Sequence, residues 1–293
     1  MIDRKKTNQT ETIMEYESLV KAALTSKKGA DMHGYNVWLS PEGYQRTSRR
    51  IQQRCLQWLM SFGTVSGHVL DVGCGTGNAL DNLTESVFDT YLGVDISPEM
   101  TGFAKQRHRR KHVEFIAQDF LSFEGCRDSF YNTVICAACL HWFFPHERQV
   151  IEKIRNTMAP GGSLFLSCAA DFHFIQAERD AQAGVLDSIR QRYQPVAAQQ
   201  LFDTRRFSDE KLKDLSAAFE LMQIDRIEER LDFTCFEDFR DWHMGSGSVV
   251  YSQFSVDDRD AATQEYYRML YDQYTSGDHA VGYSTALMLL RKR

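Results

Sequence analysis

The sequence predicts an α/β protein with a doubly wound, mostly parallel sheet of seven strands, helical lid insertions and an N-terminal helical segment. Three observations predict this fold. Short apolar runs alternate with amphipathic stretches between residues 67 and 170, a glycine-rich turn follows the first run, and two more strand-like runs follow later in the chain. Because parallel strands need crossover connections, this alternation implies a sheet covered by helices on both faces.

The core elements are predicted in order from apolar periodicity and capping residues. Five strands are expected at residues 68–72, 90–95, 112–117, 132–137 and 163–169, and three helices at 78–86, 98–109 and 146–158. The second helix has a clear start, because Ser97 can cap it and Pro98 stands in its first turn. The strand at 132–137 is almost entirely apolar, which favours a central place in the sheet.

We expect the chain to divide into a core and the segments that cover it. The expected parts are an N-terminal helical or lid segment at 1–62, a core at 63–170, a helical substrate lid at 171–206 and 236–280, and a completion of the core sheet at 207–235 and 281–293. Within the first part, helices are expected near 11–24 and 44–62. One face of the second helix carries Ile51, Cys55, Trp58 and Leu59, and should be buried.

Composition limits the possible partners and the compartment. The chain of 293 residues is 43% hydrophobic and carries a formal net charge of −6, which disfavours a nucleic-acid partner. No apolar run is long enough to cross a bilayer, so no membrane partner is expected. Seven cysteines, an odd number, fit reduced thiols and a cytoplasmic location. The single C-x-x-C pair fits structural thiols, and we expect no metal.

The first predicted strand ends in a glycine loop, GCGTG at 73–77, ahead of a helix. Glycines allow the sharp turn and let a ligand lie against bare backbone. Such a loop suits a dinucleotide or S-adenosylmethionine (SAM), and a turn without a ligand is the third interpretation. Asn78 stands where a dinucleotide fingerprint has glycine or alanine. Asp71 suits the ammonium group of a methionine moiety better than a pyrophosphate, so the loop favours SAM.

Two acidic positions extend this prediction along the strand ends. Asp95 closes the second strand about 20 residues after the first glycine, where an acidic side chain accepts hydrogen bonds from ribose hydroxyls. Asp119 and Phe120 follow the third strand. There the carboxylate can accept from an exocyclic amine while the ring packs on a flat base.

The segment after the fourth strand should face the transferred group, because ligands lie outside the carboxyl ends of parallel strands. His141 can act there as a general base or as a hydrogen-bond donor to the substrate. Trp142 can border the substrate pocket or stabilise a sulfonium through its ring face. Packing against the following helix is the alternative for both residues.

Together these motifs resemble the class I SAM-dependent methyltransferases over about residues 67–170. The resemblance implies a Rossmann-like core in which the glycines surround the methionine part of SAM, Asp95 binds the ribose, and Asp119 with Phe120 binds the adenine. The resulting set of cofactor contacts is Asp71, Gly73, Cys74, Gly75, Gly77, Asn78, Asp95, Ile96, Asp119, Phe120, Cys136 and Ala137. Many relatives have Ser-Asn where this chain has Cys136-Ala137, so part of that contact must come from the backbone.

A narrower resemblance concerns the acceptor. The run CLHWF at 139–143, the insertions after the fifth strand and the ending GYSTALMLLRKR resemble small-molecule carboxyl methyltransferases of the trans-aconitate, malonyl-carrier-protein and juvenile hormone acid types. It implies an acceptor beside Leu140, His141 and Trp142. The N-terminal segment is longer than in the short bacterial relatives, and we expect its Tyr35, Trp38 and Tyr44 to border the same pocket. Aromatic residues of the lid, among them Trp242, Tyr251, Tyr266 and Tyr267, should suit a hydrophobic substrate.

These residues predict methylation of a small-molecule acceptor. In-line O-methylation of a carboxylate, free or carrier-linked, is the preferred reaction, because a carboxylate is already ionised near neutral pH and needs no general base. The alternatives are C- or N-methylation of a specialised metabolite with His141 as base, and a SAM-binding regulator without turnover. The oligomeric state is not predicted.

Overall fold

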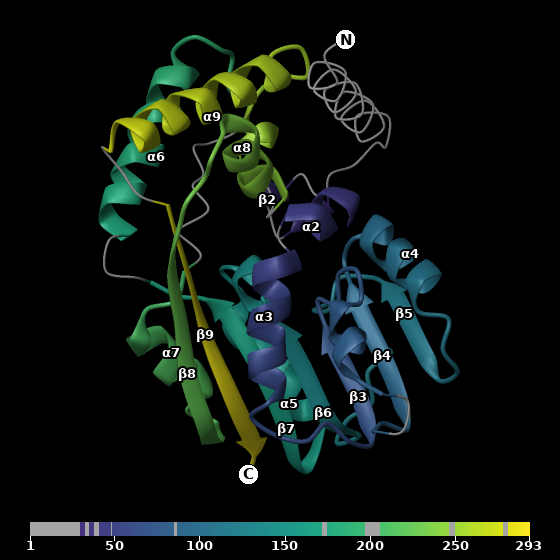
Figure 1. Cartoon of the computed structure of the whole chain (residues 1–293). Helices are drawn as coiled ribbons and strands as arrows, with labels where there is room; N and C mark the ends of the chain where they lie inside the picture. The colour runs from purple at the N-terminus through teal and green to yellow at the C-terminus, as the bar shows by residue number, and fades with distance from the viewer. Residues whose placement is uncertain are drawn as a thin grey trace, which may run out of the picture.

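The computed structural model describes residues 30–32, 35–37, 41–47, 49–84, 87–171, 175–196, 206–245, 250–277 and 281–293. Its centre is the predicted seven-stranded sheet, in the order β5-β4-β3-β6-β7-β9-β8 (Figure 1). The strands are β3 (His68–Val72), β4 (Thr90–Asp95), β5 (Val113–Ala117), β6 (Tyr131–Ala137), β7 (Met158–Ala169), β8 (Phe219–Leu231) and β9 (Val281–Lys292). The first five are parallel, and β9 lies antiparallel between β7 and β8.

Strand order reverses at β3, which pairs with β4 on one side and β6 on the other. The connections leaving these strands diverge to opposite sides of the sheet, so a crevice opens beyond their carboxyl ends. This reversal positions the candidate site, because the glycine loop follows β3 directly.

Helices cover both faces of the sheet, as expected. One face carries α3 (Arg49–Met60), the 3₁₀ helix η1 (Asn78–Asn82) and α4 (Pro98–Arg107), and the other carries α5 (Glu147–Thr157) and α7 (Asp209–Ser216). Two apolar clusters, one under each helical layer, fill the core. Ser97 caps α4 as predicted, accepting the Met100 N–H at 3.2 Å.

A helical lid stands over the carboxyl ends of the parallel strands (Figure 1). It contains α6 (Ile175–Arg190), α8 (Phe236–Gly245), η4 (Tyr251–Gln253) and α9 (Arg259–Ser276), which share a third apolar cluster. Near it lie α2 (Pro41–Thr47) and a hairpin of β1 (Ala30–Met32) and β2 (Tyr35–Val37). The 3₁₀ helix η2 (Leu140–Phe143) follows β6. The lid insertions are thus confirmed, while the exact division of the chain stays a prediction.

Three local expectations are wrong. The predicted helix at 78–86 is only the short η1, because its Asn-rich sequence bonds to its own backbone: the Asn82 side chain donates to the Asn78 carbonyl at 3.3 Å. The fifth strand begins at Met158, since the Pro-Gly-Gly segment continues the strand beyond a register shift. Trp58 is 43% exposed, because it points roughly 100° away from the buried stripe of α3 centred on Cys55 and Leu59.

The predicted helix at 11–24 lies outside the described residues. Within the described part of the chain, no helix is both long enough and apolar enough to cross a bilayer. The same part contains no cluster of three or more His, Cys, Asp or Glu side chains arranged to hold a metal ion.

Candidate functional site

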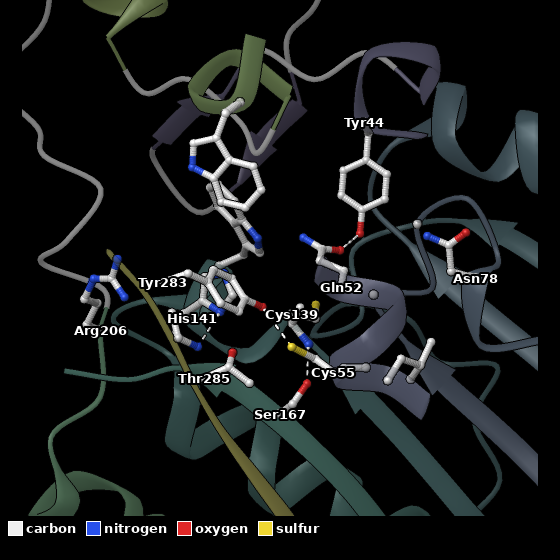
Figure 2. A pocket seen from close by; sticks show the side chains of 18 of the residues that line it. Tyr44, Gln52, Cys55, Asn78, Cys139, His141, Ser167, Arg206, Tyr283 and Thr285 are labelled. Atoms are coloured by element: carbon white, nitrogen blue, oxygen red, sulfur yellow. Dashed lines mark hydrogen bonds between the residues drawn. The ribbon is translucent and has the colours of Figure 1, made fainter. Parts of the chain in front are cut away.

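Two adjoining cavities lie at the carboxyl ends of β3, β4 and β6, and Figure 2 shows side chains that line the larger one. The larger cavity extends from the glycine loop to the lid, and the smaller one leads towards the loop after β5. Predicted residues that border the larger cavity are Tyr44, Asp71, Gly73, Cys74, Gly75, Asn78, Asp95, Ile96, Ala137, His141, Trp142 and Trp242. Those that border the smaller cavity are Gly73, Asp95, Ile96, Asp119, Phe120 and Trp142.

The glycine loop is held tightly against its neighbours on one side and open on the other. The N–H groups of Gly73 and Cys74 donate to the Val94 carbonyl at 2.8 and 3.2 Å. A Cβ on Gly73 would lie 1.9 Å from the Cys139 sulfur, so only glycine fits there. A Cβ on Gly75, which has a φ of +52°, would meet no protein atom within 4 Å. The loop therefore offers bare backbone to the cavity at Gly75.

Asp71 is a buried carboxyl at the edge of the larger cavity. Its side chain accepts a hydrogen bond from the Tyr91 hydroxyl. Burial raises the pKa of Asp71 to about 7, an effect that the Tyr91 hydrogen bond opposes and the charge of Asp95 strengthens. A cationic group bound beside this carboxyl would stabilise its ionised form.

Asp95 is fixed at the end of β4 by backbone donors. One carboxylate oxygen accepts the Gly75 N–H at 2.8 Å, and the other accepts the Ser97 N–H at 2.9 Å. Burial raises its pKa, and these two hydrogen bonds oppose the rise. Each oxygen can accept a further bond from a ligand hydroxyl, because an ionised carboxylate has about four acceptor positions.

The smaller cavity ends at Asp119 and Phe120, as the base-binding prediction requires. The Asp119 carboxylate accepts the N–H groups of Leu121 and Ser122 at 3.2 and 3.3 Å, which fixes its orientation. Phe120 is buried and packs edge-on against Phe143, with the ring centroids 6.5 Å apart. The smaller cavity therefore ends in a narrow space beside the flat ring of Phe120.

The segment after β6 turns sharply towards the cavity. Ala138 has a φ of +51°, a left-handed conformation that is uncommon for a residue with a side chain. Its N–H donates to both the carbonyl and the hydroxyl of Ser167, each at 3.0 Å. The turn brings Cys139 and Trp142 to both cavities.

His141 borders the larger cavity, and its ring accepts a hydrogen bond from the backbone of β7. The Ala169 N–H donates to His141 Nδ1 at 3.5 Å, so the neutral ring carries its proton on Nε2. A histidine in this tautomer is a donor at Nε2. The geometry therefore favours His141 as a hydrogen-bond donor and argues against its role as general base.

The structure does not bring every predicted residue to the described cavity lining. Gly77 packs under His108, because a Cβ on Gly77 would lie 2.8 Å from that ring, and Cys136, Leu140 and Tyr251 belong to the apolar clusters. Cys136 faces inward because successive side chains alternate across a strand. Gly77, Leu140 and Tyr251 lie in or next to 3₁₀ helices that pack on the core or within the lid. Trp38 and the side chain of Tyr35 lie outside the described residues.

Several cavity residues were not predicted from the sequence. They come from α3, the lid, the segment that follows it, β7 and β9, and are Gln52, Cys55, Ser167, Glu178, Gln182, Arg206, His243, Tyr283, Ser284 and Thr285. Tyr266 and Tyr267, expected in the aromatic lid, also border the cavity. The polar run Tyr-Ser-Thr inside the otherwise apolar β9 is a signal that could have identified its three members. Arg206 carries no comparable local signal.

The donor set fits SAM. Asp71 offers a buried carboxyl for an ammonium group, Gly75 leaves open space above its backbone, and Asp95 retains acceptor capacity for ribose hydroxyls. The smaller cavity continues from Asp95 to Phe120, which leaves room for a base beyond the ribose.

Comparison with known proteins identifies a methyltransferase domain within the chain. Residues 69–162 match the family model of a methyltransferase domain. The Bacillus subtilis protein YqeM, which carries the provisional name of a methyltransferase, is 28% identical over 43% of this chain and 51% of its own length. The malonyl-[acyl-carrier protein] O-methyltransferase of Acetivibrio thermocellus is 28% identical over 41% of this chain and 42% of its own length. The chain thus spans about half the length of these curated relatives.

A solved structure extends the likeness to most of the fold. A Bacillus halodurans protein, provisionally described as a methyltransferase, superposes with a TM-score of 0.54 at 16% identity. The match covers 81% of this chain and 98% of that protein. At this identity it establishes the shared fold.

Proposed function

We propose that this chain, whose residues 69–162 form a class I SAM-dependent methyltransferase domain, methylates a carboxylate oxygen of a small acid. The observation that carries the acceptor class is the guanidinium of Arg206 in the wall of the larger cavity. Figure 2 places Arg206, His141 and Thr285 on one side of this cavity and Tyr44 and Asn78 on the other. The wall beside Arg206 also contains the buried Glu178, which accepts the Gly282 N–H at 3.1 Å, and Arg206 itself donates to the Ala170 carbonyl at 3.1 Å. Arg206 is thus the cation of this side, while Asp71 and Asp95 border the proposed cofactor side.

The charges of the two sides match the two reactants. Asp71 and Asp95 attract the cationic donor, while Arg206 and the Nε2–H of His141 suit an anionic acceptor. A guanidinium is ionised throughout the working pH range and can bind a carboxylate in a fixed orientation. These groups would hold the acceptor oxygen in line without removing a proton from it.

When bound, SAM supplies a methyl group on a sulfonium, and the acceptor oxygen gains that methyl as the carbon–sulfur bond breaks. The chain's contribution is orientation and exclusion of water. Aromatic side chains from the lid and β9 help to exclude water, since Trp242 packs edge-on against Tyr283 at 6.1 Å, and Tyr266 against Tyr267 at 5.1 Å. A flat or apolar body on the acid would fill this aromatic region.

A second candidate is C- or N-methylation with a histidine base. His243 is the better base, because its Nδ1 lies 2.7 Å from the Phe239 carbonyl and must donate to it. The neutral ring then presents a lone pair at Nε2, the reverse of His141. A proton-bearing acceptor would use this group, whereas a carboxylate would not.

The test is incubation with methyl-labelled SAM and a panel of small acids, some linked to a carrier protein, with product detection by mass spectrometry. We expect label that alkali releases, as an ester requires. Label that resists alkali would overturn the carboxylate assignment and support C- or N-methylation. SAM-dependent thermal stabilisation without transfer to any acid, amine or carbon acceptor would instead indicate a regulator.

A further inference from the structure

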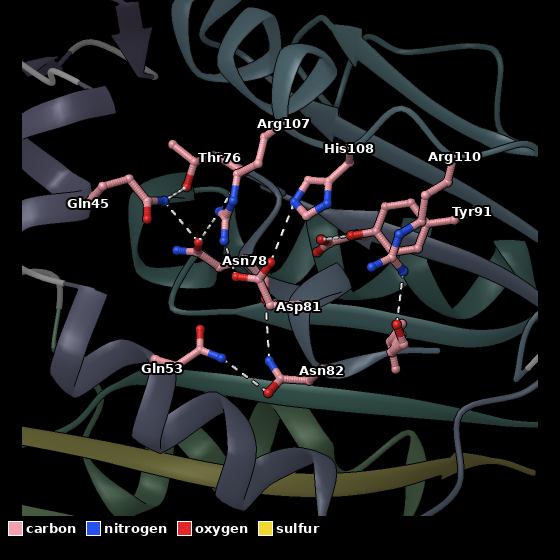
Figure 3. A network of polar contacts seen from close by, with 12 residues as sticks. Gln45, Gln53, Thr76, Asn78, Asp81, Asn82, Tyr91, Arg107, His108 and Arg110 are labelled. Carbon is pink, nitrogen blue, oxygen red and sulfur yellow. Dashed lines mark hydrogen bonds and ion pairs between the residues drawn. The ribbon is translucent and has the colours of Figure 1, made fainter. Parts of the chain in front are cut away.

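A set of hydrogen bonds joins α2 to the glycine loop and to α4 (Figure 3). Gln45 Nε2 on α2 donates to Asn78 Oδ1 at 2.9 Å and also to the Thr76 hydroxyl. Arg107 Nη1 on α4 donates to the same Asn78 oxygen at 2.8 Å and to the Thr76 carbonyl at 3.4 Å. Two helices therefore meet on one amide oxygen beside the cofactor loop.

These contacts fix the orientation of the Asn78 amide. A carbonyl oxygen has two lone pairs, and Gln45 and Arg107 engage it together. Tyr44 is the neighbour of Gln45 on α2, so the bonds that hold Gln45 also hold Tyr44 at the edge of the larger cavity. Tyr44 in turn donates its hydroxyl proton to Gln52 Oε1 on α3.

The residues that these bonds anchor lie over the cofactor side of the larger cavity. Tyr44, Gln52 and Asn78 all border that cavity. Burial raises the pKa of Tyr44, and the nearby charge of Asp95 and the Cys139 thiol add to the rise. The Tyr44 hydroxyl therefore faces the groups assigned to SAM, although it comes from the N-terminal segment.

We propose that Gln45, Asn78 and Arg107 are positioning residues that hold α2 and Tyr44 over bound SAM, so that the cofactor leaves only when these hydrogen bonds open. The inference rests on the proposed function only in naming SAM as the ligand. It uses no residue on the acceptor side. Because Gln45 is neutral, its bonds are of ordinary strength and the closure is reversible.

The chain offers a matched control on α3. Gln53 Nε2 donates to Asn82 Oδ1 at 3.1 Å, so it too is a glutamine that bridges an N-terminal helix to η1. Neither Gln53 nor Asn82 borders either described cavity. Gln53→Leu therefore removes a similar hydrogen bond and leaves the hydrogen bonds of Gln45 and Tyr44 in place.

The experiment measures the affinity and release rate of S-adenosylhomocysteine, the demethylated product form, on the full chain by calorimetry and stopped-flow fluorescence. Gln45→Leu and Arg107→Leu should each speed release by about tenfold, and Gln53→Leu by less than about twofold. Gln45→Leu and Tyr44→Phe should be strongly non-additive, because each removes a hydrogen bond that anchors the same short helix, α2.

Equal effects of Gln45→Leu and Gln53→Leu would overturn the inference, as would additive effects of Gln45→Leu and Tyr44→Phe. Arg107 also pairs with Asp81, so Arg107→Leu is accompanied by Arg107→Lys, which keeps the charge but not the geometry at Asn78. The wild type could fail to methylate any acid and still bind S-adenosylhomocysteine, with Gln45→Leu releasing it faster. That result would overturn the acceptor assignment alone. Absence of binding to the wild type would overturn both proposals.

Discussion

The side of the cavity proposed for SAM and the side proposed for the acceptor differ in their charged groups and in how the chain builds them. The cofactor side consists of loops that leave adjacent strands β3, β4 and β6, and its charged groups are Asp71 and Asp95. The acceptor side gathers His141, Arg206 and Tyr283 from segments far apart in the sequence. The side proposed for SAM is thus formed by neighbouring strands of the sheet. The side proposed for the acceptor forms only when the lid and β9 are in place.

This difference explains why the donor is easier to identify than the acceptor. A cofactor site made by consecutive loops keeps a recognisable spacing, and the same fold serves many chemistries by changing the segments added to it. The predictions below test how independent the two sides are, beginning with the largest expected effect.

Gly75→Val should abolish cofactor binding and leave the fold in place. The new side chain would enter the open space above the loop, since no protein atom lies within 4 Å of the Cβ position. We expect affinity for S-adenosylhomocysteine to fall by at least about 100-fold in calorimetry, while the positive φ costs about 1–2 kcal/mol of stability. Retained affinity would place the cofactor elsewhere.

Arg206→Gln should damage the acceptor side alone. Loss of the cation should lower kcat/KM for the acid by about 100-fold, equivalent to a charged hydrogen bond of about 3 kcal/mol. Affinity for SAM should change by less than about twofold. Arg148→Gln is the control, because that side chain is 64% exposed and pairs with Asp214 away from the cavity. A matching loss in the control variant would contradict the assignment.

Cofactor affinity should depend on pH through Asp71. Its pKa of about 7 in the free protein lies above the ordinary 3.8, and a cationic ligand requires the ionised form. Affinity should therefore fall as pH decreases below 7, by up to tenfold for each pH unit, and Asp71→Asn should flatten this profile.

The stability of the free protein should show the opposite trend at the same carboxyl. A raised pKa means that protonated Asp71 is favoured by folding, so its stabilising contribution is complete below pH 3.8 and is lost as pH rises towards 7. Asp71→Asn should consequently raise the thermal midpoint at pH 8 more than at pH 5. A pH-independent difference between the two proteins would refute a titrating Asp71.

Tyr251→Phe should have the smallest effect. Tyr251 packs in the apolar cluster of the lid and does not border the described cavities, although the sequence places it in an aromatic lid. We expect KM for the acid to change by less than about twofold, whereas Trp242→Ala should raise it by about tenfold or more. Steady-state kinetics on both variants would define the outer boundary of the acceptor side.

The sequence predicted the sheet well because its signals are local. Strand alternation, the cap at Ser97 and the loop around Gly73 depend on neighbouring residues, and each is found where expected. The predictions that failed concern positions whose environment depends on tertiary structure. The turn at Ala138 determines whether Leu140 or His141 faces the cavity. No residue type in this segment predicts that turn.

The acceptor side was predicted only in part. Trp242 reaches the cavity, but Arg206 and Tyr283 were not singled out, because their relation to His141 arises from the tertiary arrangement and has no fixed spacing. The role of Asn78 was predicted as a cofactor contact. Its bonds to Gln45 and Arg107 add a connection between distant helices that a linear pattern does not contain.

The insertion of β9 between β7 and β8 has a consequence for the order of synthesis. Strands β3 to β7 leave the ribosome before β9, which carries Tyr283, Ser284 and Thr285 into the cavity wall. Translation proceeds at about 5–20 residues per second, so the nascent chain holds the elements of the donor site for several seconds before its acceptor wall exists. A polypeptide cut short before Val281 would carry a donor site with no complete place for the molecule to be methylated.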